Sequence, residues 1–318
     1  MKFNIQNFSN YEFPMKAKLN LFKNIFFLVS LLYFSFYFLK NFGKISFNIN
    51  FEKDGIILLL SILCCILSVL FNAYAWKNII EWFGKINIKN NLISFYVATN
   101  VLKYVPGGIW HFVERFYFIK ATSNSQLAFY STLVEPYFML SASFLLASLG
   151  TIFSPIYFPL ILPFLFLNKK FIFKILRISE SLKTKIVDYL KLKNSNYKLE
   201  QRIKLTSFFP LKAILFEMAF IILKFIGFVV LFKAEYSIGK TDTLLLFVIF
   251  CLSWSIGLIV PTAPSGVGVF EACFLFLIGK NFPQNIVIVI LVYFRLISTL
   301  VDFMLSFPFL IRKFLKKI

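Results

Sequence analysis

Two short segments of the chain combine helix-breaking residues with charged residues that follow within about two helical turns. The first break consists of Pro106, Gly107 and Gly108, and Glu114 and Arg115 follow it. A helix that restarts at such a break exposes free backbone N–H groups, and glycine lets an anion approach them closely. The arginine adds a planar set of donors that fits a phosphate group. The spacing therefore predicts a site for a phosphate-bearing ligand.

The second segment has the same order of residues. Pro264 is followed by Gly266 and Gly268. Glu271 comes next, and Arg295 lies 24 residues beyond it. We expect the arginines of both segments to bind phosphate. The glutamates are expected either to hold these arginines or to line the path of a cationic or sugar head group.

The composition indicates the solvent in which these segments lie. Of 318 residues, 59% are apolar and only 15% are charged, whereas soluble proteins average about 45–50% and about 25%. So many apolar residues cannot all be hidden from water, which predicts a chain embedded in lipid. The 34 basic residues exceed the 14 acidic ones, for a formal net charge of +20. In a membrane protein this excess should mark the cytoplasmic loops.

Apolar runs near the length that crosses a bilayer, about 20 residues, recur along the chain. They are residues 21–39, 55–76, 126–149, 209–232 and 284–311, with a shorter run at 151–167 that contains three prolines. We expect an all-α integral membrane protein: a polytopic helical bundle of about 6 full spans plus two re-entrant helical hairpins, or about 8 spans. All of these elements belong to a single transmembrane domain over 21–312.

Basic residues gather between two of these runs. Residues 168–206 hold 11 Lys or Arg and three Asp or Glu, a difference of +8, so we expect this loop to be cytoplasmic. Residues 1–20 lack the order of a cleaved signal peptide and are expected to form a cytoplasmic tail. The basic tail 313–318 is expected on the same side, so that both termini are cytoplasmic.

The two breaks lie in the regions 92–120 and 244–279. A single crossing at 92–120 would place the basic loop outside, and each arm of about 14 residues is shorter than the ~30 Å core. We therefore expect a re-entrant hairpin from the cytoplasmic face. At 244–279 a short second arm favours a hairpin from the opposite face, although two complete crossings satisfy sidedness equally well. Hairpins of opposite orientation with similar breaks are typical of an inverted repeat around a substrate site.

Eight charged residues remain at apparent membrane depth, where each costs about 2.5–3.5 kcal/mol at a helix centre. They are Glu114, Arg115, Glu135, Glu217, Lys224, Glu271, Arg295 and Asp302. These residues could instead form ion pairs with one another that stabilise the fold without binding a ligand. Lys224 is expected to snorkel to the interface. We expect Asp302 to belong to the binding site and Lys103 to recruit the ligand at the cytoplasmic side.

The chain offers little for other chemistry. His111 is the only histidine, and the cysteines at 64, 65, 251 and 273 lie in apolar runs without a CxxC pair. We therefore expect no catalytic residue, no metal site and no cofactor. The sequence has no phosphate loop of the GxGxxG or GxxxxGK[ST] type. Membrane lipids with an anionic head group, not nucleic acids, are the expected partners.

The two breaks carry a family resemblance. The stretch VPTAPSGVGVFEA, followed by RLISTLVD at 295–302, resembles the signature of the lysylphosphatidylglycerol synthase transmembrane-region family, also called the flippase-like domain. The upstream stretch NVLKYVPGGIWHFVERFYFIK is similar to a second block of that family. The resemblance covers roughly 20–312. Two departures are Ser265, where the family usually has glycine, and Phe270, where it usually has arginine.

The resemblance implies a multi-pass protein of a bacterial-type cell inner membrane that moves an anionic lipid between leaflets in cell-envelope biogenesis. The cargo would be a phospholipid or a lipid-linked sugar or polyprenyl phosphate. A cell-envelope glycosyltransferase or other lipid-modifying enzyme would be a partner. We expect a stand-alone member without the family's catalytic aminoacyl-transferase domain, because 168–206 is too short to hold one.

Two alternatives stay open at the level of sequence. In the first, the chain is an integral-membrane transferase, or an accessory subunit of a lipid-linked glycosyl or aminoacyl transferase, with Glu114 or Glu271 as the base. In the second, it is a scaffold whose basic loop at 168–206 binds anionic lipid or a partner.

Overall fold

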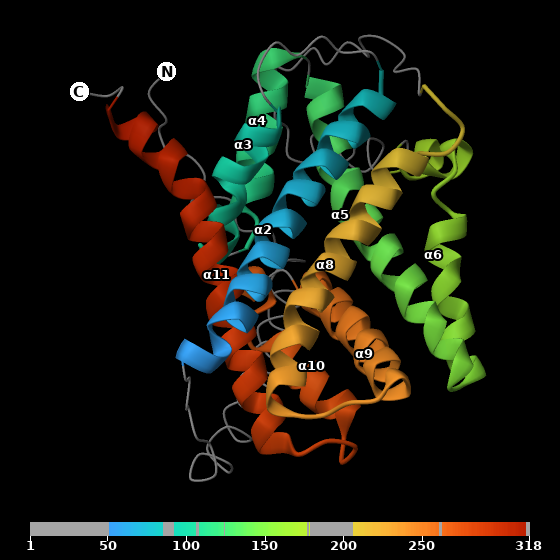
Figure 1. Cartoon of the computed structure of the whole chain (residues 1–318). Helices are drawn as coiled ribbons and strands as arrows, with labels where there is room; N and C mark the ends of the chain where they lie inside the picture. The colour runs from blue at the N-terminus through green and yellow to red at the C-terminus, as the bar shows by residue number, and fades with distance from the viewer. Residues whose placement is uncertain are drawn as a thin grey trace, which may run out of the picture.

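The computed structural model describes residues 51–84, 92–105, 108–123, 125–176, 178, 206–260 and 263–315. Within these ranges the protein is all-helical and has no strand (Figure 1). The predicted class, an all-α polytopic membrane protein, is confirmed by long apolar helices in this part of the chain. The expected tail at 1–20, the expected span at 21–39 and most of the basic loop 168–206 lie outside the described residues.

Five helices in the described ranges are long and apolar enough to cross a membrane. They are α2 (Phe51–Trp82), α5 (Ser125–Ala147), α8 (Leu211–Glu235), α9 (Lys240–Ile259) and α11 (Gln284–Leu315). Four of them, α2, α5, α8 and α11, correspond to apolar runs predicted as spans.

The proline-containing run at 151–167 forms a broken element. It continues from η4 (Ser148–Ile152) through η5 (Pro155–Ile161) into α6 (Leu162–Leu165). Proline removes a backbone donor and clashes with the preceding turn, which favours short helical pieces here. The segments Pro155–Leu165 and Lys169–Leu176 are bent by 76° relative to each other. If this pair is one span, up to six described elements are long and apolar enough to cross a membrane.

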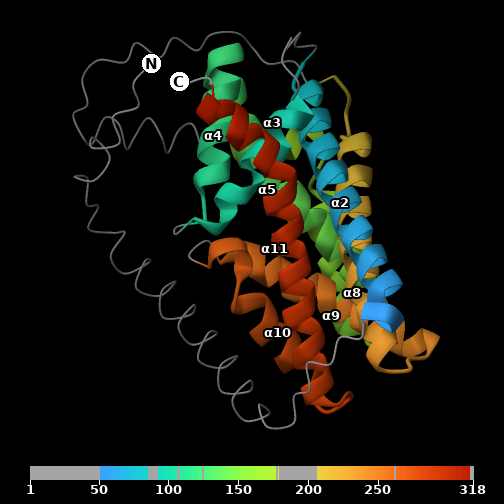
Figure 2. The same ribbon diagram turned by 60° about the vertical axis from the view of Figure 1, so that its left-hand side comes forward.

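The segment between α2 and α5 forms a hairpin. α3 (Leu92–Thr99) leads into the 3-10 helix η3 (Asn100–Tyr104), and α4 (Trp110–Thr122) returns to the end of the molecule where α3 begins (Figures 1 and 2). With 8 and 13 residues, α3 and α4 are shorter than a span requires. This geometry agrees with the hairpin predicted at 92–120.

A second hairpin lies between α8 and α11. α9 enters from the opposite end of the molecule, and after η6 (Pro264–Gly266) the helix α10 (Val269–Ile278) returns to that end (Figure 2). α10 has 10 residues and so extends over only about 15 Å, too short for a crossing. The geometry therefore favours a hairpin at 244–279 over two complete crossings. α9 begins earlier than predicted and, with 20 residues, is itself of span length.

The two hairpins point toward each other. η3 contacts η6, so the hairpin tips meet inside the bundle. Each hairpin is flanked by two long helices, α2 and α5 for the first and α8 and α11 for the second. The order of long helix, hairpin and long helix thus occurs twice with opposite orientation, as in an inverted repeat.

α2 and α8 pack closely and join the two halves. The Ser61 hydroxyl of α2 donates to the Gly227 carbonyl of α8 at 2.9 Å, and a Cβ added at Gly227 would lie 3.3 Å from the Ser61 carbonyl oxygen. Small residues permit such close approach between membrane helices. Between α8, α9, α10 and α11, aromatic rings around Phe228 and Phe250 fill the core. These contacts fix the frame in which the hairpin tips meet.

Gly266, at the second tip, should be sensitive to substitution. Its φ is +70°, and an added Cβ would lie 3.2 Å from the Cα of Gly257 on α9. We expect Gly266→Ala to lower the free energy of unfolding by at least about 1–2 kcal/mol, the cost of a left-handed conformation for an L-residue. Thermal unfolding in detergent measures the change. Gly55→Ala is the control, since nothing lies within 4 Å of its added Cβ, and equal destabilisation of both variants would contradict the expectation.

Candidate functional site

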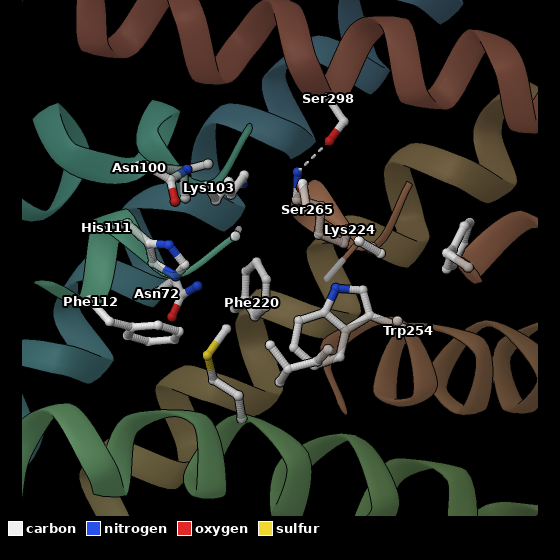
Figure 3. A pocket seen from close by; sticks show the side chains of 18 of the residues that line it. Asn72, Asn100, Lys103, His111, Phe112, Phe220, Lys224, Trp254, Ser265 and Ser298 are labelled. Carbon is white, nitrogen blue, oxygen red and sulfur yellow. Dashed lines mark hydrogen bonds between the residues drawn. The ribbon is translucent and has the colours of Figure 1, made fainter. Parts of the chain in front are cut away.

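A cavity lies where the two hairpin tips meet. Its volume is about 160 Å³, which is room for several waters or a compact polar group. Figure 3 shows Asn72, His111 and Phe112 on one side of it, facing Lys224 and Trp254 on the other. The polar and charged side chains of its lining are Asn72, Tyr96, Asn100, Lys103, His111, Arg115, Glu135, Lys224, Trp254, Ser265, Arg295 and Ser298.

Arg295 of α11 holds the second break in place. Its Nε pairs with Glu271 of α10. Its Nη1 and Nη2 donate to the carbonyls of Ser265 and Gly266, each at 3.2 Å. The guanidinium carbon lies 4.8 Å from the centre of the Phe270 ring. Arginine fits this position because its donors form a rigid planar fork, and its side chain, 21% exposed, still lines the cavity.

The same carboxylate supports the restart of the helix at α10. Gly268 adopts φ +82°, and its N–H donates to Oε2 of Glu271 at 2.7 Å. Ser265 adopts φ +53°, in a region that glycine enters more readily. Glu271 therefore serves both the first turn of α10 and Arg295. The backbone N–H of Gly268, one of the donors that we expected to bind an anion at this helix start, is therefore bound to the protein's own carboxylate.

Arg115 of α4 forms the buried ion pair of the first hairpin. Its Nη1 pairs with Glu135 of α5 rather than with the adjacent Glu114. Its Nε donates to the Thr99 hydroxyl at 3.3 Å, and its guanidinium carbon lies 3.5 Å from the centre of the Tyr96 ring, within cation–π distance. The side chains of Arg115 and Glu135 are 1% and 0% exposed. The pair therefore links the hairpin to α5 without contact with solvent.

Asp302 of α11 accepts hydrogen bonds from side chains at the tip of the first hairpin. Its Oδ1 accepts from Asn100 Nδ2 at 2.7 Å, and its Oδ2 accepts from the Tyr104 hydroxyl at 2.7 Å. Lys103 Nζ lies 2.8 Å from the same Oδ2. The Asp302 side chain is fully buried. Lys103, which we expected to recruit ligand at the cytoplasmic side, thus lies at the hairpin tip and lines the cavity.

Lys224 of α8 points into the protein. It is only 6% exposed, and its Nζ donates to the Ser298 hydroxyl at 3.0 Å (Figure 3). It forms no ion pair with any other described residue. The expectation that it snorkels to the interface was wrong, because Glu235 at the nearer end of the helix is 11 residues away, about 16 Å along the axis.

Several buried polar atoms around the cavity have no hydrogen-bond partner within the described ranges. Four belong to residues that line it: Asn72 Oδ1, His111 Nδ1, Arg115 Nη2 and Glu135 Oε2. Trp76 Nε1 and both carboxyl oxygens of Glu217 belong to residues outside the lining. Buried polar atoms are normally satisfied, so each exception needs a reason. Their concentration in one place marks the cavity as a site for water or a polar ligand.

The structure brings together predicted site residues from both breaks. Lys103, Gly108, Arg115, Gly266 and Arg295 all line the cavity. Asp302 and Glu271 lie outside the lining and pair with two of its cations, Lys103 and Arg295. Gly268 is the N-cap residue of α10, and Glu114 is half-buried away from the cavity. Gly107 lies outside the described residues.

Sequence reasoning missed part of the lining. Lys224, which lines the cavity, and Glu217, which lies outside its lining, were recognised as charges at membrane depth but received no binding role. Their spacing of seven residues places them on one face of α8, a signal that both point inward. Asn72 and Ser298 are uncharged polar residues in apolar helices, and only the fold shows that they face the same cavity.

Comparison with known proteins leaves the family of this chain open. No protein-family model matches it, and no curated protein matches it significantly. The resemblance to the lysylphosphatidylglycerol synthase transmembrane-region family therefore rests on the two motif blocks, and the function must be argued from the cavity.

The carboxylate of Asp302 should be important for stability. We expect Asp302→Asn to lower the free energy of unfolding by about 2–4 kcal/mol, because Lys103 loses its counter-charge and two strong hydrogen bonds weaken. Thermal unfolding in detergent tests this. Glu81→Gln is the control: it removes one member of the exposed Lys77–Glu81 pair, 3.6 Å apart, and should cost less than about 1 kcal/mol. Equal losses would show that Asp302 does not hold the hairpin tip.

Proposed function

We propose that this protein binds the anionic head group of a membrane lipid in the central cavity and moves the lipid between leaflets. The observation that carries the proposal is the position of a cation-lined cavity at the meeting point of two hairpins that enter from opposite ends. Many secondary transporters bind substrate near the bilayer midplane between broken helices of an inverted repeat. A flippase-like translocator is therefore the function that this geometry supports best.

The charges of the cavity favour an anion. Lys103, Arg115, Lys224 and Arg295 line it, and Glu135 is the one carboxylate among its described lining residues. Three of these cations are paired with carboxylates. Lys224 has a hydroxyl as its hydrogen-bond partner and shares the Asp302 carboxylate, beyond ion-pair distance, with Lys103. A buried charge without a close counter-charge is costly. An anion next to Lys224 would remove this cost.

A phosphate group fits the available donors. An ammonium has three N–H donors, so Lys224 retains donors beyond its bond to Ser298. Arg115 Nη2 is buried without a partner in the described ranges, and charge-assisted bonds to phosphate are strong. The cavity volume suits a head group, while the acyl or polyprenyl chains would remain in the bilayer. Phospholipids and lipid-linked sugar phosphates share this chemistry.

We further propose a bacterial-type cell inner membrane, with both termini and the basic loop 168–206 in the cytoplasm. The positive-inside rule supports this orientation. The segment Lys169–Leu176, at the start of that loop, lies at the same end of the molecule as the last turns of α11 (Figure 1). The family resemblance supports the choice of membrane, and it supports a cell-envelope glycosyltransferase or other lipid-modifying enzyme as a partner.

Lipid transport can be measured with the purified protein in vesicles that contain fluorescent phosphatidylglycerol. Chemical quenching of the outer leaflet reports the rate at which lipid changes sides. We expect Lys224→Met to lower this rate at least about tenfold, because one charge-assisted hydrogen bond contributes about 1.5–3 kcal/mol.

The matched control lies on the same helix. Lys212 is exposed near the start of α8, and Lys212→Met should retain the wild-type rate. A wild-type rate in folded Lys224→Met would exclude the cavity as the lipid site, and the absence of transport by the wild-type protein would count against translocation itself.

The orientation has its own test in bacterial cells. A green fluorescent protein that matures only in the cytoplasm is fused after Ile318 or inserted between α8 and α9, in the segment 236–239. We expect fluorescence from the first fusion and none from the second, because the last described turns of α11 and the segment 236–239 lie at opposite ends of the bundle (Figure 1). Fluorescence from both would contradict the proposed topology.

A further inference from the structure

Beside the cavity, two buried carboxyl groups lie near one guanidinium, and one of the two, Glu135, belongs to the cavity lining. Glu135 of α5 pairs with Arg115 of α4. Glu217 of α8 is fully buried, and neither of its oxygens has a hydrogen-bond partner in the described ranges. α5 packs against α8, and Glu217 lies within electrostatic range of both Glu135 and Arg115. One guanidinium cannot neutralise two buried carboxylates, so one of the two carries a proton.

Tyr96 and His111 are further titratable side chains near Glu135 and Glu217. Tyr96 of α3 stacks on Arg115 and lies in range of both glutamates. His111 of α4 has an unpartnered Nδ1, but the cations Arg115 and Lys103 act on it, which makes a further positive charge there unfavourable. The residues that α2 and α9 add to the lining are uncharged: Val69, Asn72, Trp254, Gly257 and Leu258.

We propose that Glu135 and Glu217 form a proton-binding site that couples anion binding in the cavity to the uptake of one proton. This inference rests on the proposed function and specifies how its transport is driven. Without ligand, Arg115 neutralises Glu135 and Glu217 holds a proton. Arg115 also lines the cavity, and its Nη2 has no partner in the described ranges. Its guanidinium is therefore placed to turn from carboxylate to phosphate.

The exchange balances charge. When a phosphate oxygen accepts the hydrogen bonds of Arg115, the Glu135 carboxylate loses its counter-charge at a position that is 0% exposed. It then takes up a proton from cavity water. One negative charge enters with the phosphate and one positive charge enters with the proton, so the net buried charge is unchanged. An uncompensated anion would instead carry the large cost of burying a charge.

The coupling predicts how affinity depends on pH. If one proton is taken up per anion, affinity rises about tenfold for each unit by which the pH falls. This dependence of affinity on pH applies in the pH range where Glu135 is ionised without ligand and protonated with ligand bound. A proton gradient across the membrane would then drive the lipid in the direction in which protons flow.

Isothermal titration calorimetry of the full-length protein in detergent tests the proposal. The probe is short-chain phosphatidylglycerol, a phosphodiester whose own charge does not titrate near neutral pH. Titrations in two buffers of different ionisation enthalpy count the protons taken up. We expect the wild type to take up about one proton per anion and to bind about tenfold more tightly at about pH 6 than at about pH 7.

The variants identify the site of uptake. Glu135→Gln/Glu217→Gln keeps Arg115 and should bind the probe without proton uptake and with the same affinity at both pH values. Glu235→Gln changes an exposed carboxyl on α8 and should retain uptake, and uptake should also persist in His111→Gln. Infrared difference spectra of the wild type need no variant: anion binding should add a protonated carboxyl band and remove a carboxylate band.

The outcomes separate the two proposals. Probe binding by the wild type without proton uptake or without the infrared change would overturn the proton site and leave the lipid site standing. Uptake that persists in the double variant, or that disappears in His111→Gln, would overturn it as well. No phosphatidylglycerol binding at all by the folded wild-type protein would overturn both the proton site and the proposed function.

Discussion

A chain that stops being helical at membrane depth must satisfy its own backbone, because lipid offers no hydrogen bonds. In this protein the helix α11 contacts both hairpins: Arg295 donates to two backbone carbonyls of the second break, and Asp302 accepts from side chains at the tip of the first. The two residues are seven positions apart, about 10 Å along the helix. One helix therefore fixes the distance between the hairpin tips and thus the position of the cavity.

The remaining ion pair extends the same arrangement to the other half of the protein. Arg115 and Glu135 join α4 to α5, so each of the three buried pairs among the described residues links a hairpin to a long helix. Charges that are expensive singly at membrane depth are tolerated as pairs. Two buried charged residues have no ion pair in the described ranges: Lys224, whose hydrogen-bond partner is a hydroxyl, and Glu217, whose oxygens are unpartnered. Lys224 lines the cavity in which we propose that a lipid phosphate binds, and Glu217 belongs to the pair that we propose as the proton site.

In this cavity an anionic ligand competes with the protein's own carboxylates and carbonyls for the same hydrogen-bond donors. The donors that hold the hairpins are the same groups that an anion would attract, so ligand binding must loosen some of the contacts that keep the tips together. Arg115 illustrates the point, because it has one occupied and one unpartnered terminal nitrogen. Such competition is a physical means by which a bound head group could shift the hairpins and open the cavity toward one side or the other.

Apolar run length and the Pro/Gly pattern are local properties, so the all-helical membrane class, four of the long apolar helices and the two breaks could be predicted from the sequence. The sequence also indicated which charges lie at membrane depth. The tertiary structure decided their partners. Arg115 pairs with Glu135 and not with its neighbour Glu114, and Asp302 meets Asn100 across 202 positions of the chain. Lys224 lies inside the bundle because mid-helix depth prevents its ammonium from reaching water. These pairings depend on which helices pack together, and that is fixed only when the whole bundle forms.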